Sequence, residues 1–364
     1  MRSSTMRRST CGESRVATRG KHPTMRSRAH RSTLGAGLLA ALALALAACG
    51  AAAEGPGGSH PPVARSAAAE PCGTAAAGVL GRAAGQVATR IYAGELAGTE
   101  TRSDQHQVET NAALLSAVAG GERAAITRAV TTLVYSHTHM VRLRVTSGSA
   151  VLADVGGPYI LAPAGGALRL HGRTIGHYAL SVQDDLGYVK LVTRFIGAPL
   201  VMRTGSRAIP VEGLFAGAPA SIPNRGPVKV SGMTYEAFSF AAAAFPSGPL
   251  RVSLLLPVSA GLAGESCTAI RSAELGRVAQ RISRRFSLSQ ASFSTYIKLA
   301  ASVTGGLLYV RSGSRELAGS TPRPGPARLP GSGTVAFHGA TYTVYSFQAP
   351  SSAGSVRVYQ LIKA

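Results

Sequence analysis

The stretch Tyr188-Val189-Lys190-Leu191 returns further along the chain as Tyr296-Ile297-Lys298-Leu299, at a spacing of 108 (296 − 188). Gly205-Ser206-Arg207 returns at the same spacing as Gly313-Ser314-Arg315. Internal repeats of this length indicate that one structural unit is built more than once. These matches therefore predict that the C-terminal half of the chain forms the same small sheet twice. A fainter first copy begins near Val141.

The repeat includes a helix. Leu80-Gly81-Arg82 returns as Leu275-Gly276-Arg277 at a spacing of 195 (275 − 80), and Cys72 and Cys267 have the same separation. Chance does not easily match a cysteine and a tripeptide at one spacing. We therefore predict two long helices that begin at matching cysteines and lie side by side.

An export signal precedes the repeats. Arg26, Arg28 and Arg31 follow Met25 and form a basic segment. Leu34–Ala48 is then an unbroken run of Leu, Ala and Gly. This run is shorter than the roughly 20 residues that a membrane-spanning helix needs. It ends on Leu46-Ala47-Ala48-Cys49, which resembles the bacterial lipobox. We predict cleavage before Cys49 and lipid on that cysteine, which would anchor the protein to the extracytoplasmic face of the cell membrane. An ordinary signal peptide with a chance cysteine is the alternative.

The charge of the exported part favours anionic partners. The whole chain has 38 basic and 16 acidic residues; residues 1–48 hold nine and one of them, which leaves 29 − 15 = +14. Such a surface attracts lipid headgroups, wall polymers or acidic ligands. A nucleic acid partner is not expected, because the chain is exported and has no recognition motif.

Two cysteines remain in the mature chain. An oxidising compartment favours a disulfide between Cys72 and Cys267, with two free buried thiols as the alternative. The bridge would close a long loop, with a sequence separation of 195 (267 − 72). The chain-entropy model gives an upper value of roughly 4 to 5 kcal/mol for its stabilisation of the folded protein.

Apolar periodicity divides the mature chain into helices and strands. Helical spacing covers Ala75–Leu96 and about Gln105–Val134, where Gly120-Gly121 interrupts the second helix. From Thr138 the period is two, and we predict short strands as far as Gly187–Phe195. The pattern predicts an α+β fold: long N-terminal helices, then antiparallel sheets, then a repeated helix-plus-sheet unit.

One part of the chain resembles a known family. Val151-Leu152-Ala153-Asp154-Val155-Gly156-Gly157 resembles the second strand of Cache domains, the PAS-like extracellular sensors of bacteria, and Gly176–Lys190 resembles the hairpin and last strand that follow. The resemblance covers roughly residues 75–197. It implies a Cache-like sensor domain, with the next sheet as its partner in a double-Cache arrangement.

The predicted organisation has five parts. They are a signal peptide with an extended n-region (1–48), a lipidated flexible tether (49–71), a Cache-like sensor domain (72–197), a second PAS-like sheet (198–257) and a repeated helix-plus-sheet unit (258–364). Cache domains usually precede a transmembrane helix and a signalling output, and the sequence continues to Ala364 with neither. We therefore expect any signal to pass to a separate membrane signalling protein.

Strand parity places a basic face on the predicted sensor sheet. If Leu143 and Val145 face the helices, then Arg142 and Arg144 point the other way. The resemblance implies a ligand on that face beneath the loop around Tyr159, and a cationic face suits a carboxylate or another small anion. The predicted ligand-binding residues are Arg142, Arg144, Tyr159, Arg169, His171 and Lys190. A solvated sheet face without a ligand is the alternative.

Other chemistry is weakly supported. His137-Thr138-His139 places two imidazoles on one side of a strand, but no third metal ligand is near in sequence. Asp184-Asp185 could act as a general acid and base, and turn formation is the favoured interpretation. The mature chain has no motif typical of a hydrolase, metalloprotease, redox enzyme or nucleotide-binding protein. We predict no enzymatic activity, no cofactor and no bound metal.

These observations predict a membrane-anchored extracytoplasmic lipoprotein that binds or senses a small anionic ligand. The alternative is a structural or interaction protein that docks on cell-wall polymer or on a membrane protein. An envelope hydrolase is a third, weaker interpretation.

Overall fold

The computed structural model describes residues 70–136, 139–209, 218–352 and 354–364. The predicted signal peptide, the lipidation site Cys49, most of the tether and His137 lie outside the described residues. None of the described helices is long and apolar enough to cross a membrane.

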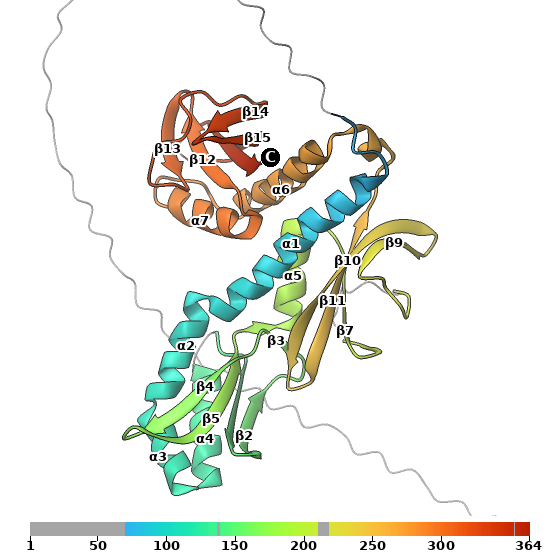
Figure 1. The fold of residues 1–364 in the computed structure, drawn as a ribbon. Coiled ribbons are helices and arrows are strands. Elements are labelled where there is room, and N and C mark those ends of the chain that lie inside the picture. The colour runs from blue at the N-terminus through green and yellow to red at the C-terminus, as the bar shows by residue number, and fades with distance from the viewer. Residues whose placement is uncertain (1–69, 137–138, 210–217, 353) are drawn as a thin grey trace, which may run out of the picture. The chain divides into compact units, whose positions relative to one another are not determined.

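Four helices open the described chain (Figure 1): α1 (Ala76–Ala97), α2 (Thr99–Thr110), α3 (Ala112–Gly120) and α4 (Arg123–Ser136). The predicted break is confirmed, because Gly121 ends α3 in the left-handed conformation with φ 69°. A second break was not predicted. It lies at Asn111, whose side-chain oxygen accepts a hydrogen bond from the Leu114 amide and caps α3.

Three antiparallel sheets follow. The first has the order β2-β1-β5-β4 and comprises β1 (Arg142–Ser147), β2 (Ala150–Gly156), β4 (Ala164–Leu170) and β5 (Arg173–Ser181). The second contains the order β8-β7-β11-β10-β9, from β7 (Leu200–Thr204), β8 (Arg207–Ala208), β9 (Arg225–Val230), β10 (Met233–Phe245) and β11 (Gly248–Pro257). The third has the order β13-β12-β16-β15-β14, from β12 (Leu307–Ser312), β13 (Arg315–Gly319), β14 (Ser332–Phe337), β15 (Ala340–Ala349) and β16 (Val356–Lys363).

The second and third sheets have one topology. Numbered within each unit, their strands run 2-1-5-4-3, and the first sheet shows the same order without its third strand. That strand, β3 (Ile160–Leu161), instead pairs with the end of β10 and with β6 (Gln183–Asp184) in the second sheet. The predicted α+β fold with N-terminal helices and antiparallel sheets is confirmed.

The prediction of a strand at Gly187–Phe195 is wrong. These residues lie in helix α5 (Asp185–Ile196), and the repeated stretch lies in helix α7 (Phe293–Thr304). Tyr188, Val192 and Phe195 are buried along one face of α5, at the spacing of a helix and not of a strand. The four-residue motif is too short to distinguish the two periods.

The repeated unit is interrupted in its first copy. The second copy runs from α6 (Cys267–Ser283) to α7 and the third sheet, while the first runs from α1 to α5 and the second sheet. In the first copy, α2 to β6 are inserted between the two helices. The insertion explains why the spacing between copies falls from 195 for the long helices to 108 for the short ones.

Equivalent tyrosines fix the alignment of the helices. The Tyr188 hydroxyl donates to the Ala88 carbonyl at 3.0 Å, and the Tyr296 hydroxyl donates to the Ala279 carbonyl at 3.2 Å. The spacing between the tyrosines is 108 (296 − 188), whereas the spacing between their acceptors is 191 (279 − 88). Structurally equivalent positions of α1 and α6 are therefore 191 residues apart in the sequence. The Leu-Gly-Arg match at a spacing of 195 differs from this offset by about one helical turn.

Two glycine contacts give the same alignment. A Cβ atom on Gly85 would overlap the Phe238 ring, and a Cβ atom on Gly276 would overlap the Tyr345 ring. The spacing between the glycines is 191 (276 − 85), and the spacing between the rings is 107 (345 − 238). Each long helix thus packs a glycine against an aromatic ring of its own sheet.

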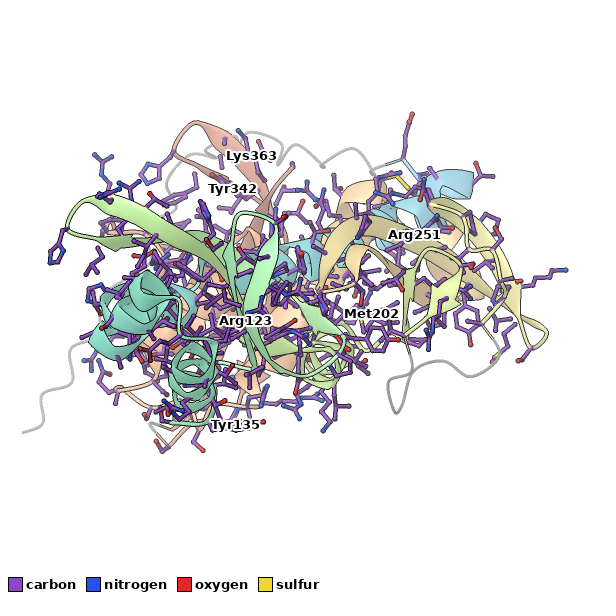
Figure 2. The ribbon with its side chains drawn as sticks, turned by 90° about the horizontal axis from the view of Figure 1, so that it is seen from below. Arg123, Tyr135, Met202, Arg251, Tyr342 and Lys363 are labelled. Atoms are coloured by element: carbon purple, nitrogen blue, oxygen red, sulfur yellow. A yellow bond between two sulfur atoms is a disulfide. The ribbon has the colours of Figure 1, made fainter. Side chains whose placement is uncertain are left out.

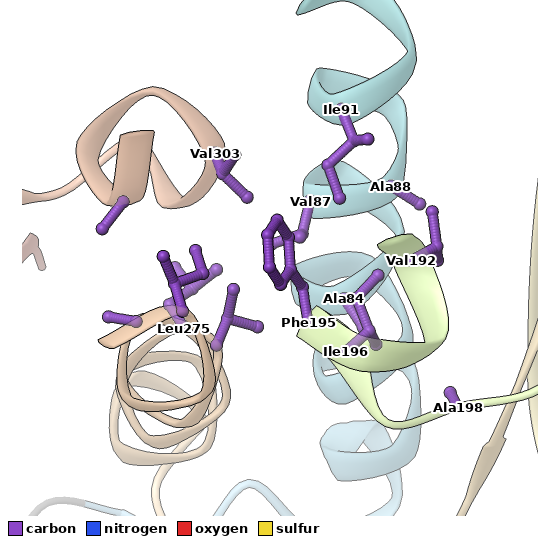
Figure 3. Packing of buried hydrophobic residues seen from close by; sticks show 14 of the residues in the cluster. Ala84, Val87, Ala88, Ile91, Val192, Phe195, Ile196, Ala198, Leu275 and Val303 are labelled. Carbon is purple, nitrogen blue, oxygen red and sulfur yellow. The ribbon is translucent and has the colours of Figure 1, made fainter. Parts of the chain in front are cut away.

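Two large apolar cores result. One joins α1, α5, α6 and α7 to the second and third sheets, and the other lies between α3, α4 and the first sheet. Figure 3 shows Phe195 of α5 between Val87 of α1 and Leu275 of α6, with Val303 of α7 beside it. The inserted segment therefore has its own core, while the two copies of the repeat share one.

The starts of α1 and α6 are joined. Cys72 and Cys267 form a disulfide with their Cα atoms 4.7 Å apart, which is the pairing that their matching positions predicted. Beside it, the Cys72 amide donates to the Glu265 carbonyl at 2.7 Å. The two long helices are therefore held together at the same end.

Candidate functional site

The predicted ligand-binding arginines of β1 are paired within the protein. Arg142 Nε lies 2.8 Å from one carboxylate oxygen of Asp154, and Arg144 lies 2.6 Å from the other. Both guanidinium groups also lie over the Phe245 ring, at 5.4 and 5.0 Å from its centroid. Burial by itself would raise the pKa of Asp154, but the hydrogen bonds and charges of the two arginines hold it below its ordinary value. One carboxylate thus offsets half of the positive charge.

Arg169 and His171 lie at the other end of the first sheet. Arg142 pairs with Ser181 of β5 and Arg169 pairs with Thr174 of the same strand, so the two arginines lie about 23 Å apart along it. His171 is exposed in the turn after β4. The structure does not bring these residues together with Arg142.

The other two predicted ligand residues lie elsewhere again. Tyr159 is half-buried next to β3, so the loop expected to cover the ligand leads into the second sheet. Lys190 is exposed on helix α5, because its predicted strand is a helix. The six residues therefore form no common site.

The two weaker chemical candidates have structural roles. Asp184 caps the N-terminus of α5 by accepting from the Gly187 amide, so it begins a helix and does not form a hairpin turn. His139 lies 3.6 Å from Glu100. Among the described residues, no three potential metal ligands lie together.

A cavity of about 570 Å³ lies where α1 ends between α5 and α7. Its apolar wall is formed by Ile91 of α1, Leu191 and Phe195 of α5, and Leu299 and Val303 of α7. Leu191 corresponds to Leu299, and Phe195 to Val303, at the repeat spacing of 108. We name this site the junction cavity. The two copies of the repeat contribute equivalent residues to its wall.

Three cationic side chains border the junction cavity. Arg90 also donates to the Thr304 carbonyl at the end of α7, at 2.6 Å, which holds its guanidinium in place. Arg285 lies over the Phe195 ring, 5.9 Å from its centroid, and Lys298 is exposed. An apolar wall beside three cations can bind a ligand that has an apolar body and an anionic group.

One carboxylate is close to these cations. Glu95 is half-buried at the end of α1, where burial, and secondarily the charge of Glu100, raise its pKa. A second cavity of about 490 Å³ shares Glu95 and Lys298 with the first and continues past Thr101. A carboxylate with a raised pKa ionises less readily, so it opposes an anionic ligand less than an ordinary carboxylate does.

Sequence reasoning missed Arg90, Arg285 and most of this site. Lys298 is in the repeated motif Tyr296-Ile297-Lys298-Leu299, so the repeat contained a signal. Its interpretation as a strand placed the motif in a sheet. Only the helical assignment brings Lys298 beside α1.

Comparisons with known proteins come from structure alone. No protein-family model and no curated protein matches the chain. The periplasmic domain of Vibrio cholerae LuxQ aligns over 49% of this chain and 100% of its own, at 11% identity and a TM-score of 0.35. The ligand-binding domain of the Pseudomonas fluorescens chemoreceptor CtaA, in complex with L-alanine, aligns over 46% of this chain and 95% of its own, at 10% identity and a TM-score of 0.27. At these values neither likeness assigns a ligand or a partner to this chain.

Proposed function

We propose that this protein is an extracytoplasmic, lipid-anchored binding protein that senses a small amphipathic anion in the junction cavity. The observation that carries the proposal is the apolar wall of Leu191, Phe195 and Leu299 next to the cations Arg285 and Lys298. The proposal keeps the anionic ligand predicted from the sequence and moves its site from the first sheet to the helices.

The location of the cavity supports a sensing role. Its lining includes Gly98 and Thr99, where α1 passes into the inserted segment, as well as α5 and α7 from the two copies of the repeat. A ligand in this position contacts three parts of the fold at once. It would favour whichever arrangement of them improves its contacts, and this is how a ligand shifts a conformational equilibrium. A separate membrane protein would then bind one of these conformations and transmit the signal.

Binding can be tested with matched pairs of ligands. We expect medium-chain carboxylic acids and alkyl phosphates to raise the melting temperature, and their neutral methyl esters to have little effect, because binding stabilises only the native state. Lys298→Gln and Arg285→Gln should each weaken binding about tenfold or more, as expected for the loss of a charge-assisted hydrogen bond.

Lys190→Gln is the matched control. Lys190 occupies the position on α5 that Lys298 occupies on α7, and it does not line the cavity. The Lys190→Gln substitution removes the same charge as Lys298→Gln and should leave the affinity for the acids and alkyl phosphates nearly unchanged. Equal weakening by Lys190→Gln and Lys298→Gln, or equal binding of acids and esters, would contradict the proposed site.

The lipid anchor is tested separately. Cys49→Ala should abolish incorporation of radiolabelled palmitate and release the protein from the membrane fraction. Absence of incorporation from the wild type would argue for an ordinary signal peptide, and incorporation that persists in the variant would contradict Cys49 as the lipidated residue.

A further inference from the structure

A second hollow lies between helix α1 and strand β10, and Arg90 lines both this hollow and the junction cavity. It consists of two adjoining hollows of about 490 and 520 Å³, which share Arg225 and Phe240. Arg82 of α1 lines one of them, and Arg251 of β11 lines the other. We name this surface the α1–β10 cleft. Figure 2 shows Arg251 on the strands of the second sheet.

Arg225 is held in the cleft by three contacts. Its guanidinium lies 3.4 Å from the centroid of the Phe238 ring. One of its nitrogens donates to the Asn224 and Ser239 carbonyls, at 2.6 and 2.7 Å. These contacts orient the guanidinium and leave its charge unpaired, because carbonyls and aromatic rings are neutral. Partial burial, and secondarily the charge of Arg82, lower the pKa of Arg225, which indicates that the two cations are close.

The carboxylate of Glu236 offsets this charge only in part, because it raises the pKa of Arg225 while the net shift stays downward. Glu236 is buried beneath α1, where one of its oxygens accepts from the Gly226 amide at 3.2 Å. In the described part of the chain, neither Arg82 nor Arg225 forms a salt bridge. The cleft therefore presents more positive than negative charge.

The second copy of the repeat shows that these two arginines are not needed for the fold. Ser332 pairs with Tyr345 in the third sheet as Arg225 pairs with Phe238 in the second, so Ser332 corresponds to Arg225. At the helix alignment of 191, Arg82 corresponds to Ala273. The same sheet and helix thus form without either cation.

Other arginines are kept in both copies and have structural roles. Arg251 and Arg357 lie beside the equivalent hydroxyls of Ser239 and Ser346, at 3.5 and 3.3 Å. On α6, Arg277 corresponds to Gln86 at the alignment of 191, and it forms a salt bridge with Glu274 at 2.8 Å. At the positions of Arg82 and Arg225, unpaired cations are therefore present in the first copy and absent from the second.

We propose that the α1–β10 cleft binds the phosphate groups of a linear phosphodiester polymer. Guanidinium groups suit phosphate oxygens through paired, charge-assisted hydrogen bonds. Two adjoining open hollows with cations on both sides fit consecutive phosphates along a chain better than one isolated ion. The net charge of +14 on the mature chain draws such a polymer to the surface. This inference does not depend on the ligand of the junction cavity.

The chain itself supplies the variants for the test. Arg82→Ala and Arg225→Ser introduce the residues that the second copy has at these positions, so the variants should fold. Binding of a fluorescent glycerol phosphate oligomer is measured by anisotropy at two salt concentrations. We expect the double variant to bind at least tenfold more weakly, with a salt slope reduced by about 1 to 2, because each released counterion adds about 0.7 to the slope for a single strand.

Arg207→Ala with Arg315→Ala is the charge-matched control, because both arginines are exposed at equivalent hairpins. It should retain most of the binding. Equal loss in the control would show attraction by net charge only and would overturn the proposal. So would binding of anionic vesicles in place of the oligomer. Orthophosphate that competes as strongly as the oligomer, phosphate for phosphate, would overturn the assignment to a polymer.

Discussion

At the scale of single residues, the clearest duplicated feature is an arginine that holds a loop. Arg203 donates to the carbonyls of Pro219 and Ala220, at 2.7 and 2.9 Å. Arg311 donates to the carbonyls of Pro326 and Ala327, at 2.6 and 3.2 Å. The spacing is 108 between the arginines (311 − 203) and 107 between the loops (326 − 219). Each guanidinium supplies hydrogen bonds that the loop backbone cannot make for itself.

We expect Arg311→Ala to lower the free energy of unfolding by about 2 to 4 kcal/mol. The change leaves two loop carbonyls and the half-buried Glu316 without the buried arginine that pairs with them. Urea denaturation measures the loss. Arg315→Ala, an exposed neighbour in the hairpin, should change stability by less than about 0.5 kcal/mol. Similar losses in the two variants would show that the loop contacts contribute little.

Asp185 should make stability depend on pH. Burial, and secondarily the charge of Asp184, raise its pKa to about 7. A raised pKa means that the protonated form is favoured in the folded protein. This contribution is complete below the unfolded pKa near 4 and is lost as the pH rises through about 7.

Asp185→Asn removes this titration. Between about pH 4 and pH 8 the wild type should lose on the order of 1 to 2 kcal/mol of unfolding free energy relative to the variant, after allowance for partial exposure. Urea denaturation at several pH values measures the difference. Parallel pH profiles for the two proteins would contradict the raised pKa.

At the scale of elements, glycine decides how closely each long helix approaches its sheet. Gly85 lies under the Phe238 ring, whereas Gly94 of the same helix has open space around its Cα atom. Glycine costs a helix interior roughly 1 kcal/mol relative to alanine. The cost is retained at Gly85 because a side chain there would displace the ring.

Two alanine substitutions in α1 should therefore have opposite signs. Gly94→Ala should raise the free energy of unfolding by about 0.5 to 1 kcal/mol through helix propensity. Gly85→Ala should lower it by about 1 to 3 kcal/mol, because overpacking outweighs that gain. Thermal and urea denaturation of both variants provide the check. Stabilisation by Gly85→Ala would mean that the helix and sheet are separated more widely than described.

At the scale of the whole molecule, an inserted segment separates the two helices of the first copy, and one disulfide joins the two copies. The insertion has its own core of α3, α4 and the first sheet. The bridge between Cys72 and Cys267 spans a sequence separation of 195, so the entire first copy and its insertion lie within the loop.

Cys72→Ser with Cys267→Ser should lower the free energy of unfolding by about 2 to 5 kcal/mol, because the unfolded chain regains the freedom that a long closed loop removes. Urea denaturation of the double variant gives the magnitude. Peptide mapping of the exported wild type without reduction should recover the two cysteines in one linked pair. Two alkylatable thiols in that sample would contradict the pairing.

The repeats in the sequence determined much of the architecture. Matches such as Gly205-Ser206-Arg207 with Gly313-Ser314-Arg315 identified two like sheets, and the spacing of Cys72 and Cys267 identified the bridge. Residue identity is sufficient here, because duplicated segments with the same side chains adopt the same local structure. The long N-terminal helices and the strands of the first sheet followed from apolar periods.

Only the tertiary structure decided the rest. The motif around Lys190 fits a strand or a helix, and burial of Tyr188, Val192 and Phe195 against α1 and α6 selects the helix. Arg144 is neutralised because it pairs in register with Asp154, and no local pattern encodes the register between two strands. The junction cavity is lined by Arg90 of α1 and Lys298 of α7, which lie far apart in the sequence. Periodicity describes one element at a time, whereas charge pairing and cavities arise where separate elements meet.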